Sequence, residues 1–172
     1  MRWTLQVVFL ATSVGLSFPG CVAPPARVVA AQVSTGDEPE IDPQALLDQI
    51  VKAQNHERAE ADLLPLAINK RLCIAAQRQA DDMAERNKMD HTGSDGSSSV
   101  DRIKDAGYNY KRCGENIAWG QKSVPEVVDV WMKSPPHKKN ILGSFTQVGA
   151  ARAFSKEGTP YWCVVFGTPL RD

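Results

Sequence analysis

The sequence predicts an α+β domain in which several amphipathic helices surround a small antiparallel sheet. Helical periodicity follows four good N-cap residues, and two β-branched and aromatic segments near the C-terminus are separated by a turn region. The chain has 172 residues, of which 42% are hydrophobic, and this suffices for one globular domain with a proper core. We find no internal repeat.

The helices are expected from caps and apolar spacing. Asp42 caps a first helix that runs to about residue 60, and Asn69 caps a second that runs to about residue 87. Ser98, with Asp101 three residues on, opens a short helix that ends at residue 107. Ser123 starts a fourth helix, which the segment Ser134-Pro135-Pro136 ends.

The strands are expected from composition. Residues 108–117 read as extended, and residues 145–150 and 161–167 form a predicted antiparallel pair around the turn region 155–160. Helices around such a sheet give an α+β or three-layer arrangement.

The N-terminal segment is typical of a secretory signal. Arg2 precedes an uncharged, mainly apolar run over residues 5–18, and cleavage is expected after Ala30 or Ala31. Two alternatives stay open: the signal ends just before Cys21, which is then lipidated, or the apolar run is an uncleaved anchor helix.

Three parts follow from this assignment. Residues 1–31 are the signal, the polar residues 32–41 form a spacer with little to bury, and residues 42–172 are the domain. Cleavage leaves 18 basic and 20 acidic residues, a net charge of −2, so no basic face for nucleic acid is indicated. We expect an extracellular or periplasmic protein, peripheral to a membrane only if the lipid is attached.

Three cysteines remain in the domain. An odd number in an exported protein indicates one disulfide and one free thiol. Cys113 and Cys163 lie in segments expected to be extended, and if these strands are neighbours a bridge between them would stabilise the fold by roughly 4 kcal/mol on the chain-entropy model. Cys73, on the apolar side of the second helix, is then a buried thiol.

Three residues are candidates for chemistry. Glu115 lies in an apolar, Gly-flanked run where a bare charge is expensive to bury, so it needs a partner. His91 lies in a Gly/Ser/Asp loop, and His137 follows two prolines. We expect the fold to bring the three together, as ligands of a divalent cation or as an acid/base pair, although each could also be a satisfied structural hydrogen-bonder. His56 reads as solvated and has no predicted role.

Seven motifs, taken in order over about residues 45–167, resemble the CAP superfamily, which comprises cysteine-rich secretory proteins, antigen 5 and pathogenesis-related 1 proteins, in its bacterial SCP-like extracellular form. The matching segments are Asn55-His56-Glu57-Arg58 with Leu64-Pro65-Leu66, Ala75-Ala76-Gln77 with Ala80-Asp81-Asp82-Met83-Ala84, His91 with Gly93-Ser94-Asp95-Gly96, Gly114-Glu115-Asn116-Ile117-Ala118, Trp131-Met132-Lys133-Ser134-Pro135-Pro136-His137, Asn140-Ile141-Leu142 and Phe145-Thr146-Gln147-Val148-Gly149.

The resemblance implies a three-layer α-β-α sandwich with a central cleft, where two histidines and two glutamates can hold a divalent cation such as zinc. His91 and Glu115 carry over directly. Ser134 and Ser144 stand where many eukaryotic members have the other glutamate and histidine, and His137 resembles the histidine of the bacterial Ser-Pro-Xaa-His segment. We therefore expect a binding cleft of His91, Glu115, Ser134 and His137. The expected metal ligands are His91, Glu115 and His137.

Three functions compete. The first is an exported binding module whose cleft holds a divalent cation, a lipid, a peptide or another cell-envelope ligand. The second is a metal-dependent hydrolase or peptidase with Glu115 as base, although no nucleophile elbow or phosphate loop is present and no catalytic residue can be named. The third is a structural envelope protein without a ligand.

Overall fold

The computed structural model describes residues 42–170. The predicted signal, Cys21 with its alternative lipid anchor, and the spacer over residues 32–41 lie outside the described residues. Within residues 42–170, no helix is long and apolar enough to cross a membrane.

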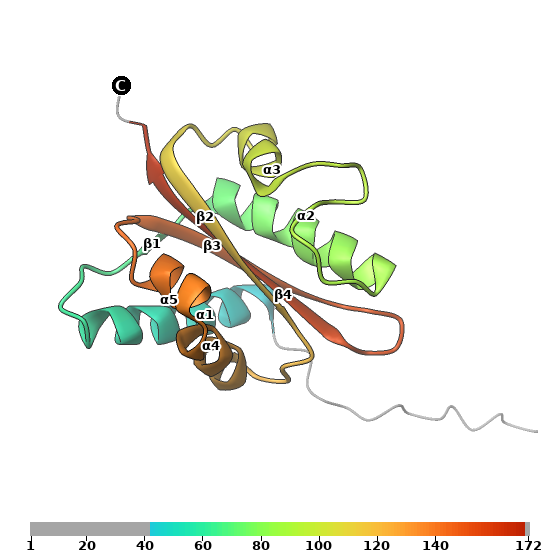
Figure 1. The fold of residues 1–172 in the computed structure, drawn as a ribbon, viewed down its shortest axis with the longest axis horizontal. Coiled ribbons are helices and arrows are strands. Elements are labelled where there is room, and N and C mark those ends of the chain that lie inside the picture. Colours follow the sequence, from blue (N-terminus) through green and yellow to red (C-terminus); the bar gives the residue numbers. More distant parts are fainter. Residues whose placement is uncertain (1–41, 171–172) are drawn as a thin grey trace, which may run out of the picture. The chain divides into compact units, whose positions relative to one another are not determined.

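Helices and strands are interspersed along this part of the chain (Figure 1). Their order is α1 (Pro43–Ala59), β1 (Ala67–Ile68), α2 (Lys70–Arg86), α3 (Ser99–Asp105), β2 (Tyr110–Trp119), α4 (Val124–Lys133), α5 (Pro135–Ile141), β3 (Gln147–Phe154) and β4 (Pro160–Pro169).

The predicted helix starts are confirmed. Asp42, Asn69 and Ser123 each accept a hydrogen bond from a backbone N–H of the first helical turn, through a side-chain oxygen. Ser98 and Asp101 form a complete capping box at the start of α3. These signals are local, so they can be read without knowledge of the tertiary structure.

Two elements were not predicted. The prolines expected to end α4 also begin α5, because proline at the first helical position gives up an N–H that has no helical partner there. Ser134, with extended φ and ψ, separates the two helices. β1 has two residues and pairs in parallel with Gln147 and Val148, so the sheet is mixed rather than wholly antiparallel.

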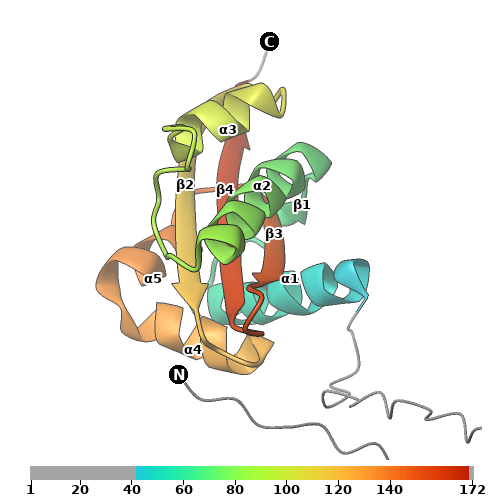
Figure 2. The ribbon, with the colours of Figure 1, turned by 90° about the vertical axis from the view of Figure 1, so that its right-hand side faces the viewer.

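The sheet has the strand order β1-β3-β4-β2, and β4 pairs antiparallel with both of its neighbours. α2 and α3 cover one face, while α1, α4 and α5 cover the other, as Figures 1 and 2 show. The result is the expected three-layer α-β-α sandwich.

Alternation along β4 divides the core into two halves. Trp162, Val164 and Phe166 pack toward α1, α4 and α5, whereas Tyr161, Cys163 and Val165 pack toward α2 and α3. At Gly149 of β3 an added Cβ would lie 2.2 Å from the α2 backbone. Only glycine therefore allows α2 to approach the sheet so closely.

The end of α1 holds a buried arginine that the sequence did not single out. His56 is exposed, as expected, but Arg58, two residues further on, is only 3% exposed. Its guanidinium donates to the backbone carbonyls of Leu64, Ile141 and Gly143 at 2.7–2.8 Å. Arg58 thus joins α1 to the segment that follows α5.

The predicted disulfide between Cys113 and Cys163 is wrong. Their strands are neighbours, as expected, but the register places Cys113 opposite Gly167 and Cys163 opposite Ile117. Four residues of strand separate the two positions by roughly 13 Å, whereas a disulfide needs Cα atoms within about 7 Å. Cys73, Cys113 and Cys163 are all free thiols.

Candidate functional site

The candidate site lies at the outer edge of β2. β2 is an edge strand, and side chains reach it from the loop after α2, from α3 and from α5. We call the group formed by His91, Arg102, Glu115, Asn116, His137 and Asn140 the β2-edge cluster.

Glu115 has the partners that its burial requires. Its side chain is 2% exposed, and its two carboxylate oxygens accept hydrogen bonds from different groups. Oε1 accepts from Nδ1 of His91 at 2.7 Å, and Oε2 accepts from the guanidinium of Arg102 at 2.8 Å. The Cys163 thiol lies 3.7 Å from the same Oε2. The carboxylate is therefore fully occupied and closed to solvent.

Arg102 is the residue that sequence reasoning missed. Its side chain is 1% exposed, and besides Glu115 it donates to the backbone carbonyls of Ser97 and His91 at 2.9 and 3.0 Å. One buried guanidinium thus neutralises the carboxylate and fixes the loop that carries His91. Arg102 lies in the short helix α3, which is too short for a periodic sequence pattern to indicate that this side chain is buried.

His91 is held by one ring nitrogen and open at the other side. Because a carboxylate only accepts, Nδ1 carries the proton in the bond to Glu115. That hydrogen bond raises the pKa of His91 above its ordinary value, against an opposing effect of partial burial. The side chain is 57% exposed, so much of the ring faces solvent while Nδ1 is held by Glu115.

Asn116 follows Glu115 in β2, so its side chain lies on the opposite face of the sheet. Its Nδ2 donates to the backbone carbonyl of His137 at 3.1 Å, and its Oδ1 accepts from Asn140 at 2.8 Å. Asn140 also donates to the backbone carbonyl of Glu115 at 3.2 Å. These bonds fasten α5 to the edge of β2.

Gly114 provides the room for this attachment. A Cβ at position 114 would lie 3.1 Å from Oδ1 of Asn140 and 3.1 Å from the ring of Phe145. In this run of β2, Gly114 leaves room for Asn140 and Phe145, Glu115 directs its carboxylate toward α3, and Asn116 directs its amide toward α5.

His137 turns partly inward. It is half-buried, and its Nδ1 is enclosed without a hydrogen-bond partner among the described residues. Burial lowers the pKa of His137, and the nearby charge of His91 lowers it further. His91 and His137 thus approach the β2 edge from its two sides. The surroundings of His91 favour its charged form, and those of His137 favour its neutral form.

The predicted site residues are placed as follows. The structure brings His91 and Glu115 into direct contact and sets His137 within the electrostatic reach of His91. Ser134 is half-buried between α4 and α5, and its side chain makes no capping hydrogen bond. Within residues 42–170, no three His, Cys, Asp or Glu side chains are grouped so as to hold a metal ion.

Two cavities lie away from the histidines of this cluster. A cavity of about 420 Å³ lies between α1, α2 and β3, and a smaller one of about 150 Å³ lies between α2 and the loop at residues 93–97. Arg102 borders the smaller one, but neither cavity is lined by His91, Glu115, Ser134 or His137. The β2-edge cluster therefore combines a buried ion pair, Glu115 with Arg102, and an exposed His91.

Known proteins share this sequence pattern and fold. The model of the cysteine-rich secretory protein family, CAP, matches residues 51–166. The uncharacterized protein YkwD of Bacillus subtilis is 42% identical over 102 residues, which are 59% of this chain and 40% of YkwD. The chain thus matches less than half the length of that relative.

Solved structures agree in fold. An outer surface protein of Borrelia burgdorferi has a TM-score of 0.66 at 22% identity, over 72% of this chain and 92% of that chain. An extracellular SCP-domain protein of Bacillus anthracis has a TM-score of 0.65 at 23% identity, over 73% of this chain and 41% of that chain. Because the family model covers most of the described residues and these folds agree, the chain belongs to the cysteine-rich secretory protein (CAP) family.

Proposed function

We propose that this chain is an exported binding protein whose ligand is held at the β2-edge cluster by His91 and His137. The observation that carries the proposal is the state of His91: a buried, already neutralised carboxylate fixes its ring, yet more than half of the side chain faces solvent. A histidine with a purely structural role would have little reason to be both oriented and exposed. Export is supported by the signal-like N-terminal sequence and by the extracellular and outer surface relatives.

The chemistry of the two rings favours a polar cell-envelope ligand with an anionic group. His91, favoured in its charged form, is a donor to an anion, and His137, favoured in its neutral form, offers a second polar atom beside it. A lipid headgroup or an acidic peptide of the envelope would supply such an anionic group.

A divalent cation such as zinc is the second candidate. Nδ1 of His91 already donates to a carboxylate, an arrangement that orients many metal-binding histidines through their other nitrogen. Glu115 does not fit as a ligand itself, because both of its oxygens are occupied. A cation here would therefore rest on the two imidazoles and on groups supplied by water or by the ligand.

Hydrolysis finds less support. A general base must reach the proton that it removes, but the carboxylate of Glu115 is 2% exposed and tied to both His91 and Arg102. The structural alternative rests on that same buried ion pair, which needs no ligand to explain it.

Calorimetric titration distinguishes these functions. Zinc chloride, vesicles of anionic phospholipid and soluble peptidoglycan fragments are each titrated into the protein, the His91→Ala variant and the His56→Ala variant. His56 is an exposed histidine of α1 and serves as the matched control. We expect one probe to give heat with the protein and with His56→Ala, and none with His91→Ala.

Two results would contradict the proposal. Equal heat from the His91→Ala variant would place the ligand elsewhere. Absence of heat with every probe, together with a lowered melting temperature of His91→Ala, would favour the structural role. Cleavage of a peptide probe that stops in Glu115→Gln would instead restore the hydrolase.

A further inference from the structure

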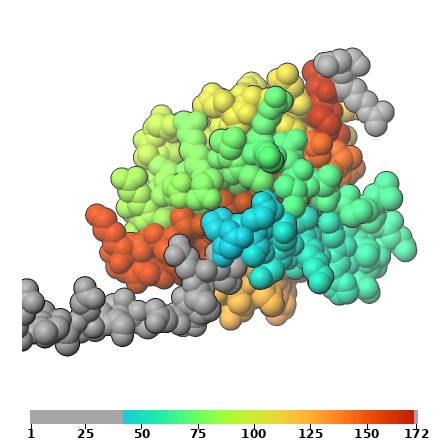
Figure 3. Space-filling model, turned by 180° about the vertical axis from the view of Figure 1, so that it is seen from behind, coloured from blue at the N-terminus to red at the C-terminus, as the bar shows by residue number. Residues whose placement is uncertain are grey.

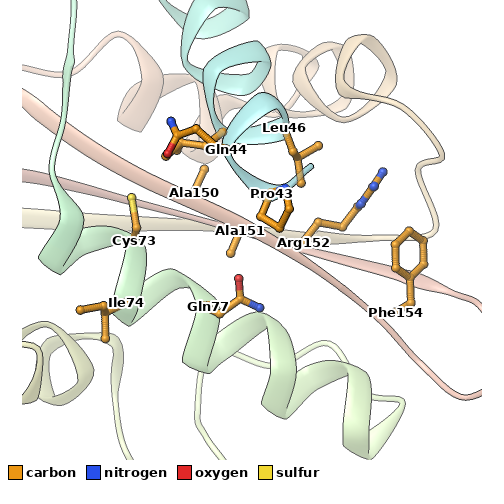
Figure 4. A pocket seen from close by; sticks show the side chains of 11 residues that line it. Pro43, Gln44, Leu46, Cys73, Ile74, Gln77, Ala150, Ala151, Arg152 and Phe154 are labelled. Atoms are coloured by element: carbon orange, nitrogen blue, oxygen red, sulfur yellow. The ribbon is translucent and has the colours of Figure 1, made fainter. Parts of the chain in front are cut away.

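A groove runs along the outer edge of β3, on the side of the sheet remote from the β2-edge cluster. It encloses about 420 Å³ and is walled by Pro43 and Leu46 of α1 and by Ile74 and Gln77 of α2, with Ala150 and Arg152 of β3 at its base (Figure 4). Figure 3 shows this face, with the first turns of α1 in cyan beside α2 in green.

The base of the groove is an unpaired strand edge. β1 pairs only with Gln147 and Val148, so the rest of β3 has no strand on its outer side within the described residues. The backbone carbonyl of Val148 faces β1, accepting from Asn69, and alternation turns the backbone groups of Ala150 and Arg152 to the same side. The Cys73 thiol lies against the Ala150 backbone, which leaves the groups from Arg152 onward free.

The walls leave space for an added strand. The β3 side chains beside the edge are small, Gly149, Ala150, Ala151 and Ala153, so little stands between a ligand backbone and the edge. Helices α1 and α2 flank the groove on its two sides. Unpaired N–H and C=O groups in such a setting gain most from a partner that offers acceptors and donors at strand spacing, which an extended peptide does and an acyl chain does not.

A positive charge marks one end of the groove. The Arg152 guanidinium lies over the rings of Phe154 and Trp162, at 4.6 and 5.1 Å from their centroids. No carboxylate among the described residues forms a salt bridge with it. A guanidinium that contacts aromatic rings and has no acidic partner among the described residues can donate its N–H groups to a carboxylate.

We propose that the open edge of β3 binds an extended peptide as an additional strand, with a carboxylate of the peptide paired to Arg152. The occupant is a segment of another protein with small or β-branched residues and an acidic residue or free C-terminus. This site is separate from the β2-edge cluster, so it neither requires the proposed function nor shares its residues.

The probe is a synthetic array of heptapeptides that alternate small and β-branched residues and carry free C-terminal carboxylates. The strongest binder is resynthesised for titration and for amide hydrogen exchange. We expect the amides of Arg152 and Phe154 to exchange more slowly in the complex. N-methylation at every second residue of the peptide should abolish binding, whereas N-methylation at the residues between them should leave binding unchanged. The reason is that only alternate amides of a strand face the neighbouring strand.

Variants locate the contact. Gln77→Trp, which fills the groove, should weaken binding at least about tenfold, whereas Glu85→Trp, an exposed change on the same helix away from the groove, should not. Arg152→Gln should weaken the free-acid peptide by about tenfold or more and bring it to the affinity of the C-terminal amide.

Three results would overturn the proposal. They are an array without any binder tighter than about 1 mM, an N-methyl scan without a two-residue period, and binding that Gln77→Trp leaves intact. Binding of a fatty acid in the groove, if no peptide binds there, would likewise assign the groove to a different ligand.

Discussion

The two exposed edges of the sheet are treated in opposite ways. At β2, the outward backbone carbonyls of Glu115 and Ile117 accept hydrogen bonds from the side chains of Asn140 and Trp131, at 3.2 and 3.1 Å. At β3, the Cys73 thiol lies against the backbone of Ala150, but the edge beyond Ala150 has no comparable cover within the described residues and lies at the base of an apolar groove.

The difference teaches where each kind of interaction can occur. An unpaired edge invites another strand, and proteins usually block it. α4 and α5 block the edge of β2, so this edge is available only to side-chain chemistry, which His91 and His137 provide. The edge of β3 keeps open backbone groups beyond Ala150. The two binding proposals rest on this difference between an edge closed by side chains and an edge with open backbone groups.

The largest expected effect comes from breaking the ion pair beneath the β2-edge cluster. Arg102→Met leaves the carboxylate of Glu115 buried without its cation, and we expect a loss of about 3–5 kcal/mol in the free energy of unfolding, measured by urea denaturation. The double variant Arg102→Met with Glu115→Gln should recover part of this loss, since no buried charge remains. A loss below about 1 kcal/mol for the single variant would show that water reaches Glu115.

The elements that could be predicted are those that local sequence determines. Asp42, Asn69, Ser98 and Ser123 start their helices as expected because a cap needs only the next three residues. The need of Glu115 for a partner followed from its apolar surroundings in the same way.

What could not be predicted depends on register and on contacts between distant residues. Neighbouring strands were inferred for Cys113 and Cys163, but their four-residue offset is fixed only when the sheet forms. The sequence singled out neither Arg102 nor Arg58, and each is buried because its guanidinium donates to backbone carbonyls of distant segments. Hydrophobic periodicity carries no signal for a buried guanidinium.

The comparison of the edges predicts an intermediate effect at Asn140. Asn140→Ala leaves the backbone carbonyl of Glu115 and the side-chain oxygen of Asn116 without the donor that Asn140 provides. We therefore expect a loss of about 1–3 kcal/mol in the free energy of unfolding. Faster exchange of the β2 amides should accompany it.

The matched change at the other edge is Gln77→Ala. This side chain lines the groove and, among the described residues, hydrogen-bonds only Asp81 of its own helix, so we expect a change within about 0.5 kcal/mol. Equal losses for the two variants would show that the edges are stabilised alike and would remove the contrast.

The smallest effect separates the two histidines by pH. Because the bond to Glu115 raises the pKa of His91, its stabilising effect is present at low pH and is lost as the pH rises through that raised pKa. Burial and the charge of His91 lower the pKa of His137, so its neutral form stabilises the fold above the ordinary pKa and this contribution is lost as the pH falls.

The two histidine variants should therefore depend on pH in opposite ways. His91→Ala should lower the free energy of unfolding more near about pH 5 than near about pH 9, and His137→Gln should do the reverse. Proton NMR titration of the two rings measures both directions, and Glu115→Gln should remove the upward shift in the pKa of His91. If His91 and His137 instead titrate at the same pH, then the polar edge of β2 does not couple His91 to His137, and its chemistry reduces to two independent side chains.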